Sequence, residues 1–139
     1  MVSAGIYSVA SEADMIALGQ TFVAQLQAGD CVMLSGELGA GKTTFVRGCL
    51  LGLSWDEPVR SPTYNLVQLF DTNPPVVHAD LYRVKSYEGI GIEDYVDDHI
   101  CFIEWPDRAV GLLQPDAAWE VRIAFSPGGR TVEIIAPLA

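Results

Sequence analysis

The residues best suited to chemistry lie in one short stretch, residues 36–43, which read Gly-Glu-Leu-Gly-Ala-Gly-Lys-Thr. This stretch fits the phosphate-binding pattern G-x-x-x-x-G-K-[ST]. Its glycines permit positive φ angles and let several backbone N–H groups approach one phosphate. Lys42 can supply a cation for the β- and γ-phosphates of a nucleotide, and the Thr43 hydroxyl is a hard oxygen ligand for Mg²⁺. The stretch therefore predicts a nucleotide phosphate site with magnesium.

The flanking sequence predicts a strand before this loop and a helix after it. Residues 31–34 are an apolar run, typical of a strand buried on both faces. After the loop, apolar residues recur at helical spacing until Gly52, where the helix should end. The start of that helix would direct its free N–H groups and its positive dipole end at the phosphates. A chance match in a glycine-rich turn is the alternative, and this strand–loop–helix context argues against it.

Two acidic residues could complete a site for nucleotide hydrolysis, which requires Mg²⁺ held from two sides and a positioned water. Glu104 lies near the end of the stretch 100–105, which is otherwise apolar, where a second acid on the metal side is expected. Asp80 lies in a β-like stretch, residues 78–83, and could orient the water or hold a metal-bound water. The alternatives are a surface acid that terminates a strand for Glu104, and a solvent-facing strand residue for Asp80.

A further hydroxyl lies between the predicted helix and the next strand, in Ser61-Pro62-Thr63. Segments that sense nucleotide occur at this place, and Thr63 could approach the γ-phosphate and the metal. Taken alone, the tripeptide is only a turn signal. We interpret His78 and His99 as ordinary polar residues, because no second His or Cys stands at metal-ligand spacing from either.

The rest of the chain predicts the elements that would position these residues. Residues 5–9 suit an edge strand, and a helix should follow Ser11, which resembles an N-cap. Residues 65–71 and 76–81 are joined by a turn too short for a helical crossover, so they should pair as an antiparallel hairpin. A second hairpin is expected for 119–125 and 131–135. One or two short helical turns are expected within 86–96, and a short helix or turn should begin at Pro106.

These elements predict one α/β domain, residues 1–139, of the P-loop NTPase-like class. We expect a mixed sheet with parallel core strands and antiparallel hairpins, and helices on both faces.

Composition restricts the functional class. Half of the 139 residues are hydrophobic and the net charge is −10, so the chain should be globular and should not bind nucleic acid strongly through its own surface. Residues 88–107 contain seven acids and no lysine or arginine, which indicates either a solvated face or a docking surface for a basic partner. We expect a cytoplasmic protein with no membrane segment, in which the three cysteines are buried free thiols.

The motifs, in this order, resemble the bacterial TsaE (YjeE) family, small P-loop ATPases of tRNA threonylcarbamoyladenosine (t6A) synthesis. The matching stretches are G-E-L-G-A-G-K-T-T (36–44), S-P-T-Y (61–64), H-A-D-L-Y-R (78–83) and I-E-W (103–105). The closing turn at 112–115 and the hairpin that holds Arg130 are also similar, so the resemblance spans nearly the whole chain. The first stretch alone is shared by many enzymes, whereas the combination is specific.

The resemblance implies a role for each matching residue. Lys42 and the loop amides would hold the phosphates of ATP, and Thr43 and Glu104 would bind Mg²⁺. Asp80 would serve in hydrolysis, and Thr63 would sense the γ-phosphate. Ser11 and Arg130 would contribute to the adenosine pocket. The full set expected to contact nucleotide is Ser11, Gly36, Glu37, Leu38, Gly39, Ala40, Gly41, Lys42, Thr43, Thr44 and Arg130.

The resemblance also implies two partner proteins, TsaB and TsaD, which carry the tRNA chemistry. An acidic chain bound to such a complex would need no basic face of its own. The leading hypothesis is a slow ATPase whose hydrolysis resets this complex. A small-molecule kinase and a non-catalytic binding module controlled by nucleotide are the alternatives. A GTPase is disfavoured because the sequence contains neither N-K-x-D nor D-x-x-G.

Overall fold

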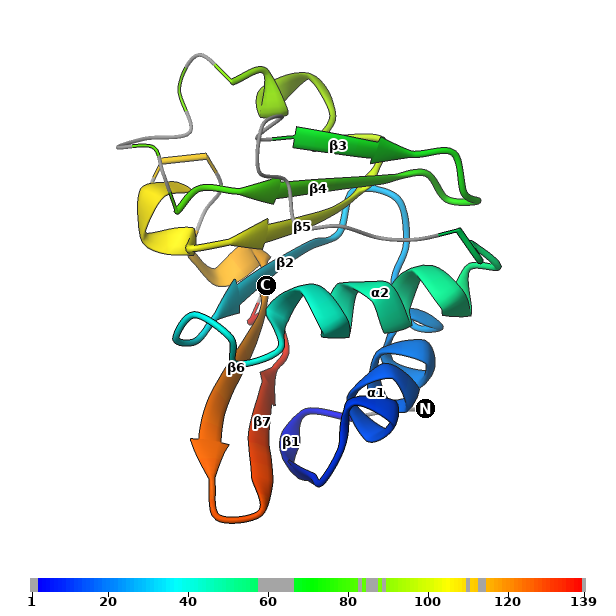
Figure 1. Ribbon diagram of the computed structural model, residues 1–139. Helices are drawn as coiled ribbons and strands as arrows, with labels where there is room; N and C mark the ends of the chain where they lie inside the picture. Colours follow the sequence, from blue (N-terminus) through cyan, green and yellow to red (C-terminus); the bar gives the residue numbers. More distant parts are fainter. Residues whose placement is uncertain are drawn as a thin grey trace.

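A computed structural model describes residues 3–57, 67–82, 84, 88, 90–109, 111, 112 and 115–138. Seven strands form one sheet in the order β1-β7-β6-β2-β5-β4-β3 (Figure 1). The strands are β1 (Gly5–Val9), β2 (Cys31–Ser35), β3 (Val67–Phe70), β4 (Val76–Asp80), β5 (Ile100–Glu104), β6 (Trp119–Ser126) and β7 (Gly129–Ile135). The helices are α1 (Glu12–Val23), α2 (Lys42–Gly52) and the 3₁₀ helices η1 (Ile92–Asp94), η2 (Pro106–Ala109) and η3 (Pro115–Ala117).

The sheet is mixed, as predicted. Its centre is parallel, because β2 pairs in parallel with both β5 and β6, and β4 pairs in parallel with β5. Antiparallel pairs lie on both sides: β3 with β4, β6 with β7, and β1 with β7 at the edge. Both predicted hairpins and the predicted edge strand are therefore confirmed.

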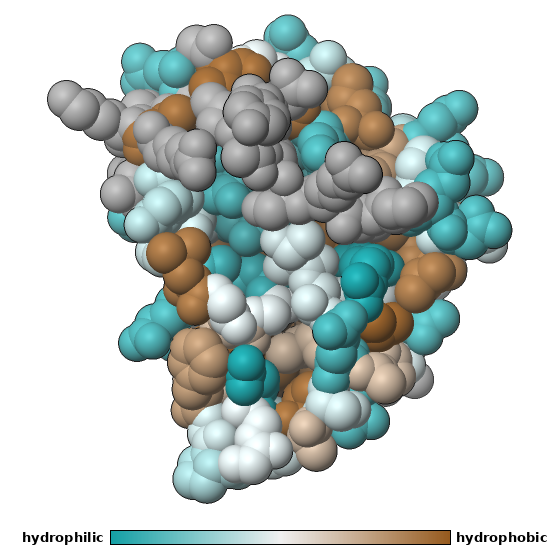
Figure 2. Space-filling view, viewed as in Figure 1, coloured by the Kyte–Doolittle hydropathy of each residue, from teal (hydrophilic) through white to brown (hydrophobic). Residues whose placement is uncertain are grey.

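The two faces of the sheet are covered differently. Helices α1 and α2 pack on each other and share one hydrophobic cluster with the sheet, in which Phe22 and Phe45 are fully buried (Figure 1). A second cluster on the other face contains Ile92 of η1. The expected helices are thus divided unequally: both α-helices cover one face, and the described part of the other face carries the 3₁₀ helix η1. On the face seen in Figure 2, hydrophilic and hydrophobic side chains are interspersed.

Helices α1 and α2 approach each other closely at two glycines. A Cβ atom on Gly48 would lie 2.3 Å from the carbonyl oxygen of Ile16, and one on Gly19 would lie 2.5 Å from the carbonyl oxygen of Phe45.

The start of α1 is fixed by Ser11, whose Oγ accepts a hydrogen bond from the Asp14 N–H at 3.1 Å. The predicted N-cap is thereby confirmed.

The three cysteines are buried free thiols, as predicted. Cys31 and Cys101 are directly opposite on the neighbouring strands β2 and β5. A hydrogen bond with Cys101 and burial raise the pKa of Cys31, and burial raises the pKa of Cys49. Within the described part of the chain, no helix has the length and apolar character required to span a membrane.

Candidate functional site

The glycine-rich loop, residues 36–41, connects the end of β2 to the start of α2. Gly39 and Gly41 have φ angles of 79° and 116°, which L side chains rarely adopt. A Cβ atom on Gly36 would lie 2.4 Å from the carbonyl oxygen of Ile123, so the loop begins directly against β6. Gly41 is the N-cap of α2 and supplies no side-chain acceptor to its first turn. The N–H groups there are therefore available to an anion.

Lys42 is the first residue of α2, and its side chain is buried. Its ammonium donates a hydrogen bond to the carbonyl oxygen of Gly36 and lies 3.9 Å from the centroid of the Trp105 ring. Burial lowers the pKa of Lys42, while the negative charges of Glu104 and Asp80 act in the opposite direction. The ammonium thus lies in the field of two carboxylates.

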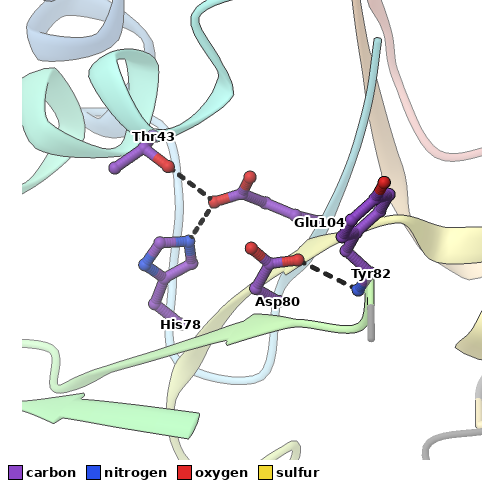
Figure 3. A network of polar contacts seen from close by, with 5 residues as sticks. All are labelled: Thr43, His78, Asp80, Tyr82 and Glu104. Carbon is purple, nitrogen blue, oxygen red and sulfur yellow. Dashed lines mark hydrogen bonds and ion pairs between the residues drawn. The ribbon is translucent and has the colours of Figure 1, made fainter. Parts of the chain in front are cut away.

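Those carboxylates come from two adjacent strands. Asp80 and Glu104 are register partners at the ends of the parallel strands β4 and β5. Glu104 is only 3% exposed, which excludes the alternative of a surface acid. Its Oε2 accepts hydrogen bonds from Thr43 Oγ1 at 3.0 Å and from His78 Nε2 at 2.6 Å (Figure 3).

Asp80 is half-buried, with one oxygen engaged by the backbone. Its Oδ1 accepts a hydrogen bond from the N–H of Tyr82 at 3.0 Å (Figure 3). The bond holds the carboxylate at the end of β4, beside Glu104. Asp80 therefore lies at the site and is not simply a solvent-facing strand residue.

The residue after β5, Trp105, has a left-handed backbone with φ of 62°, which is uncommon for a residue other than glycine. Its ring packs on Tyr82 with a centroid distance of 4.8 Å and on the Lys42 ammonium. Neither the contact of Trp105 with Lys42 nor that of His78 with Glu104 was predicted from the sequence. Two signals were available: Trp105 directly follows Glu104, and both residues occur in the stretches that carry the family resemblance.

Two pockets flank the glycine-rich loop and share Gly39, Gly41 and Thr44. The first has a volume of about 240 Å³ and brings together Lys42, Thr43, Asp80 and Glu104, with Leu38 and Trp105 at its wall. The second has a volume of about 340 Å³ and is lined by Val9, Ala10, Ser11, Glu12, Met15, Gly129 and Arg130 in addition to the shared residues.

Ser11 and Arg130, expected at a nucleoside pocket, both line the second pocket. Ser11 Oγ is already used in capping α1. The Arg130 guanidinium donates hydrogen bonds to the carbonyl oxygens of Ala40 at 3.0 Å and Gly39 at 3.5 Å, and it stacks 4.3 Å from the Phe125 ring centroid. Arg130 therefore ties the β6–β7 hairpin to the loop.

The remaining predicted residues have different positions. Within the loop, the Ala40 N–H donates to the Glu37 carbonyl oxygen at 3.0 Å, and neither residue lines the described pockets. Leu38 is largely exposed at the loop tip. Thr63, with the rest of 61–64, lies outside the described residues. Among the residues that are described, no group of three or more His, Cys, Asp and Glu could hold a metal ion.

The fold and the site together define an α/β protein whose mixed sheet carries a glycine-rich strand–loop–helix unit opposite two acidic strand ends. Comparison with known proteins identifies the family. The family model described as "Threonylcarbamoyl adenosine biosynthesis protein TsaE" matches residues 9–132. The chain therefore belongs to the TsaE family, which takes part in t6A biosynthesis, and the resemblance seen in the sequence is confirmed.

Individual relatives agree with this assignment. A "tRNA threonylcarbamoyladenosine biosynthesis protein TsaE" of Haemophilus influenzae is 43% identical over 110 residues, covering 76% of this chain and 69% of the relative. A protein of the same description from Borreliella burgdorferi is 38% identical over 130 residues, covering 89% and 94%. The crystal structure of Bacillus subtilis YdiB superimposes with a TM-score of 0.83 at 26% identity, covering 99% of this chain and 88% of that one.

Proposed function

We propose that this protein binds ATP with Mg²⁺ and hydrolyses it slowly, in support of the complex that makes t6A in tRNA. The observation that carries the proposal is the first pocket, in which Lys42 and Thr43 at the start of α2 face Asp80 and Glu104 across about 240 Å³. Phosphoryl transfer requires a cation, a hydroxyl and carboxylates arranged around free helix N–H groups, and this pocket contains all of them.

The phosphates would be held by the first turn of α2, by the amides of the glycine-rich loop and by Lys42. Within the described part of the chain, the Lys42 ammonium contacts a neutral carbonyl, that of Gly36, and the aromatic ring of Trp105. Phosphate oxygens are stronger acceptors because they are charged. A triphosphate would therefore draw Lys42 from the Trp105 ring.

The donor set fits magnesium. The Thr43 hydroxyl donates its hydrogen to Glu104 Oε2, which leaves the lone pairs of its oxygen for a metal ion. Thr43 and Glu104 would hold the ion, with phosphate and water oxygens completing its shell. Bound there, Mg²⁺ would neutralise charge that develops on the phosphates.

Asp80 would orient the attacking water and accept its proton. The Tyr82 N–H bond keeps its carboxylate at the pocket. Among the described residues that line this pocket, Lys42 is the single cation. Phosphate-loop enzymes that are given an additional arginine by a partner gain roughly 10³–10⁵-fold in turnover. Slow hydrolysis by the isolated chain, accelerated by partners, is the expected behaviour.

The second pocket would hold the adenosine. It opens on the other side of Gly39 and Gly41, so a nucleotide could cross the loop from one pocket to the other. Arg130 would act chiefly by fixing the loop carbonyls, since its guanidinium is already bonded to two of them.

The partners would be proteins of the TsaB and TsaD type, in the cytoplasm where tRNA is modified. A net charge of −10 is unfavourable for direct tRNA binding and suits docking to a more basic protein. In this proposal the tRNA chemistry belongs to the partners, and ATP controls their association with this chain.

The proposal is tested by measuring phosphate release by the purified chain, alone and with TsaB and TsaD. We expect slow release that requires Mg²⁺ and increases with the partners. A pull-down of the partners with ATP, ADP and a non-hydrolysable analogue then separates binding from hydrolysis as the signal. Absence of ATP binding by calorimetry, or transfer of the phosphate to a small-molecule acceptor instead of water, would contradict the proposal.

A further inference from the structure

His78 is an unusual residue for a fully buried position on a strand. It lies on β4, its side chain is fully buried, and Nε2 is 2.6 Å from Glu104 Oε2. Its other ring nitrogen, Nδ1, is buried and has no hydrogen-bond partner among the described residues. A buried polar nitrogen without a partner is unfavourable, so a purely apolar side chain would pack here at lower cost.

The geometry fixes the position of the ring proton. An ionised carboxylate can only accept hydrogen bonds, so Nε2 must carry the hydrogen that Glu104 receives. His78 therefore directs its Nε2–H at Glu104.

The bond completes a chain across three elements, from Thr43 on α2 through Glu104 on β5 to His78 on β4 (Figure 3). Both donors bind the same oxygen, Glu104 Oε2. A glutamate side chain has three rotatable bonds, and two donors on one oxygen restrict all of them. The outer Oε1 then keeps one direction relative to the Thr43 hydroxyl.

We propose that His78 is a positioning residue for the metal site: it holds Glu104 so that the carboxylate accepts the Thr43 hydroxyl hydrogen while Oε1 faces the metal. This inference rests on the proposed function and adds a residue that does not itself touch metal or nucleotide. Groups that hydrogen-bond to a metal ligand fix its orientation, and their loss typically weakens metal affinity by about 10–100-fold.

Two substitutions of similar size separate positioning from packing. In His78→Gln the side-chain amide nitrogen can reach the place of Nε2 and can still donate to Glu104. In His78→Asn the amide nitrogen reaches only the place of Nδ1, so the bond to Glu104 is lost. A residue that merely fills space would respond similarly to both substitutions.

The readout is the magnesium enhancement of nucleotide binding, the ratio of the dissociation constants of a non-hydrolysable ATP analogue in EDTA and in Mg²⁺, measured by calorimetry. We expect this ratio to fall by about 10–100-fold in His78→Asn and to stay within about threefold of wild type in His78→Gln. Binding in EDTA should be unchanged in both, because Lys42 and the loop amides remain. Equal losses in the two variants, or no loss in His78→Asn, would overturn the proposal.

A second measurement needs no nucleotide. The chain contains two histidines, so a ¹⁵N NMR spectrum of the imidazoles can be assigned with His99→Gln. We expect the His78 ring to carry hydrogen on Nε2, and an Nε2 without hydrogen would overturn the inference. Suppose that wild-type protein carries the ring hydrogen on Nε2 but shows no magnesium enhancement of nucleotide binding. The hydrogen bond between His78 and Glu104 would then be established, but the proposed function and the metal role of His78 would be contradicted.

Discussion

The ammonium of Lys42 lies 3.9 Å from the centroid of the Trp105 ring, so the cation at the start of α2 rests on an aromatic face at the end of β5. The contact depends on the left-handed backbone of Trp105, with φ of 62°, and on Tyr82, which packs on the ring. A cation on an aromatic face gains about 0.5–2 kcal/mol, less than a charged phosphate partner offers. The Trp105 ring therefore orients the Lys42 ammonium but binds it weakly enough for a phosphate to displace the contact.

Removing this cation should weaken nucleotide binding. In Lys42→Ala the phosphates lose a buried charged partner, and we expect a loss of about 2–5 kcal/mol in the free energy of ATP binding. Isothermal calorimetry measures the loss directly. Arg122→Ala is a suitable control, because Arg122 lies on the exposed surface of β6 in ion pairs with Glu120 and Glu133. Equal affinities for Lys42→Ala and wild type would contradict the assignment of the loop.

In the nucleotide-free protein, the difference in stability between wild type and Lys42→Met should depend on pH. Burial lowers the pKa of Lys42 below its ordinary value of 10.5, so the unfolded chain binds this proton more tightly than the folded chain. The protonated lysine thus opposes folding at neutral pH, and its cost declines as pH rises through the folded pKa toward 10.5. The unfolding free energy of wild type minus that of Lys42→Met should increase with pH in this range. Urea titrations of both proteins measure the difference, and a decrease would contradict the shift.

Nucleotide binding should change the fluorescence of Trp105. If a triphosphate draws the Lys42 ammonium away, the ring loses a direct cationic neighbour. The other two tryptophans are remote from this contact, because Trp55 packs on Phe70 and Trp119 packs on Phe22. Titration with the Mg²⁺ complex of an ATP analogue should therefore change the emission of wild type and leave that of Trp105→Phe nearly constant. An equal change in the two proteins would place the signal elsewhere.

Asp80→Asn should separate binding from hydrolysis. The amide is nearly isosteric and can still accept from the Tyr82 N–H, but it cannot take a proton from water. We expect phosphate release to fall by about 10²–10⁴-fold, the usual contribution of a general base, with ATP affinity changed little. Glu93→Gln, at an exposed acid in η1, is the control. Unchanged turnover in Asp80→Asn would remove Asp80 from the mechanism.

Much of this arrangement follows from local sequence signals. The run 100–103 is apolar because β5 is buried on both faces, and the short turn at 71–75 permits only an antiparallel return. Once β4 and β5 lie in parallel, their ends meet at one edge of the sheet, which brings Asp80 and Glu104 together. Lys42, Thr43 and these two acids were predicted to share a site because each supplies a group that nucleotide hydrolysis requires, and the parallel pairing of β4 and β5 shows how the fold brings the acids together.

The features that were not predicted from the sequence depend on contacts between residues far apart in the chain, which no local pattern indicates. His78 was interpreted as an ordinary polar residue because it has no ligand spacing to another His or Cys, yet it is fully buried against Glu104. The bond exists only because two strands far apart in sequence lie in one register. The unequal division of helices has a similar origin, since periodicity identifies an apolar stripe but does not say which face of the sheet it covers.

The close crossing of α1 and α2 yields the last prediction. Glycine in the middle of a helix usually costs about 0.5–1 kcal/mol relative to alanine, so Gly48→Ala would stabilise α2 if space were available. The Ile16 carbonyl oxygen would lie 2.3 Å from the new Cβ, and backbone cannot move aside as a flexible side chain can. We therefore expect destabilisation of about 1–3 kcal/mol, measured by urea unfolding, and weaker ATP binding because α2 carries Lys42 and Thr43 at its start. Gln20→Ala, on the exposed side of α1, should change stability by less than about 0.5 kcal/mol. A more stable Gly48→Ala protein would contradict the close packing of the two helices.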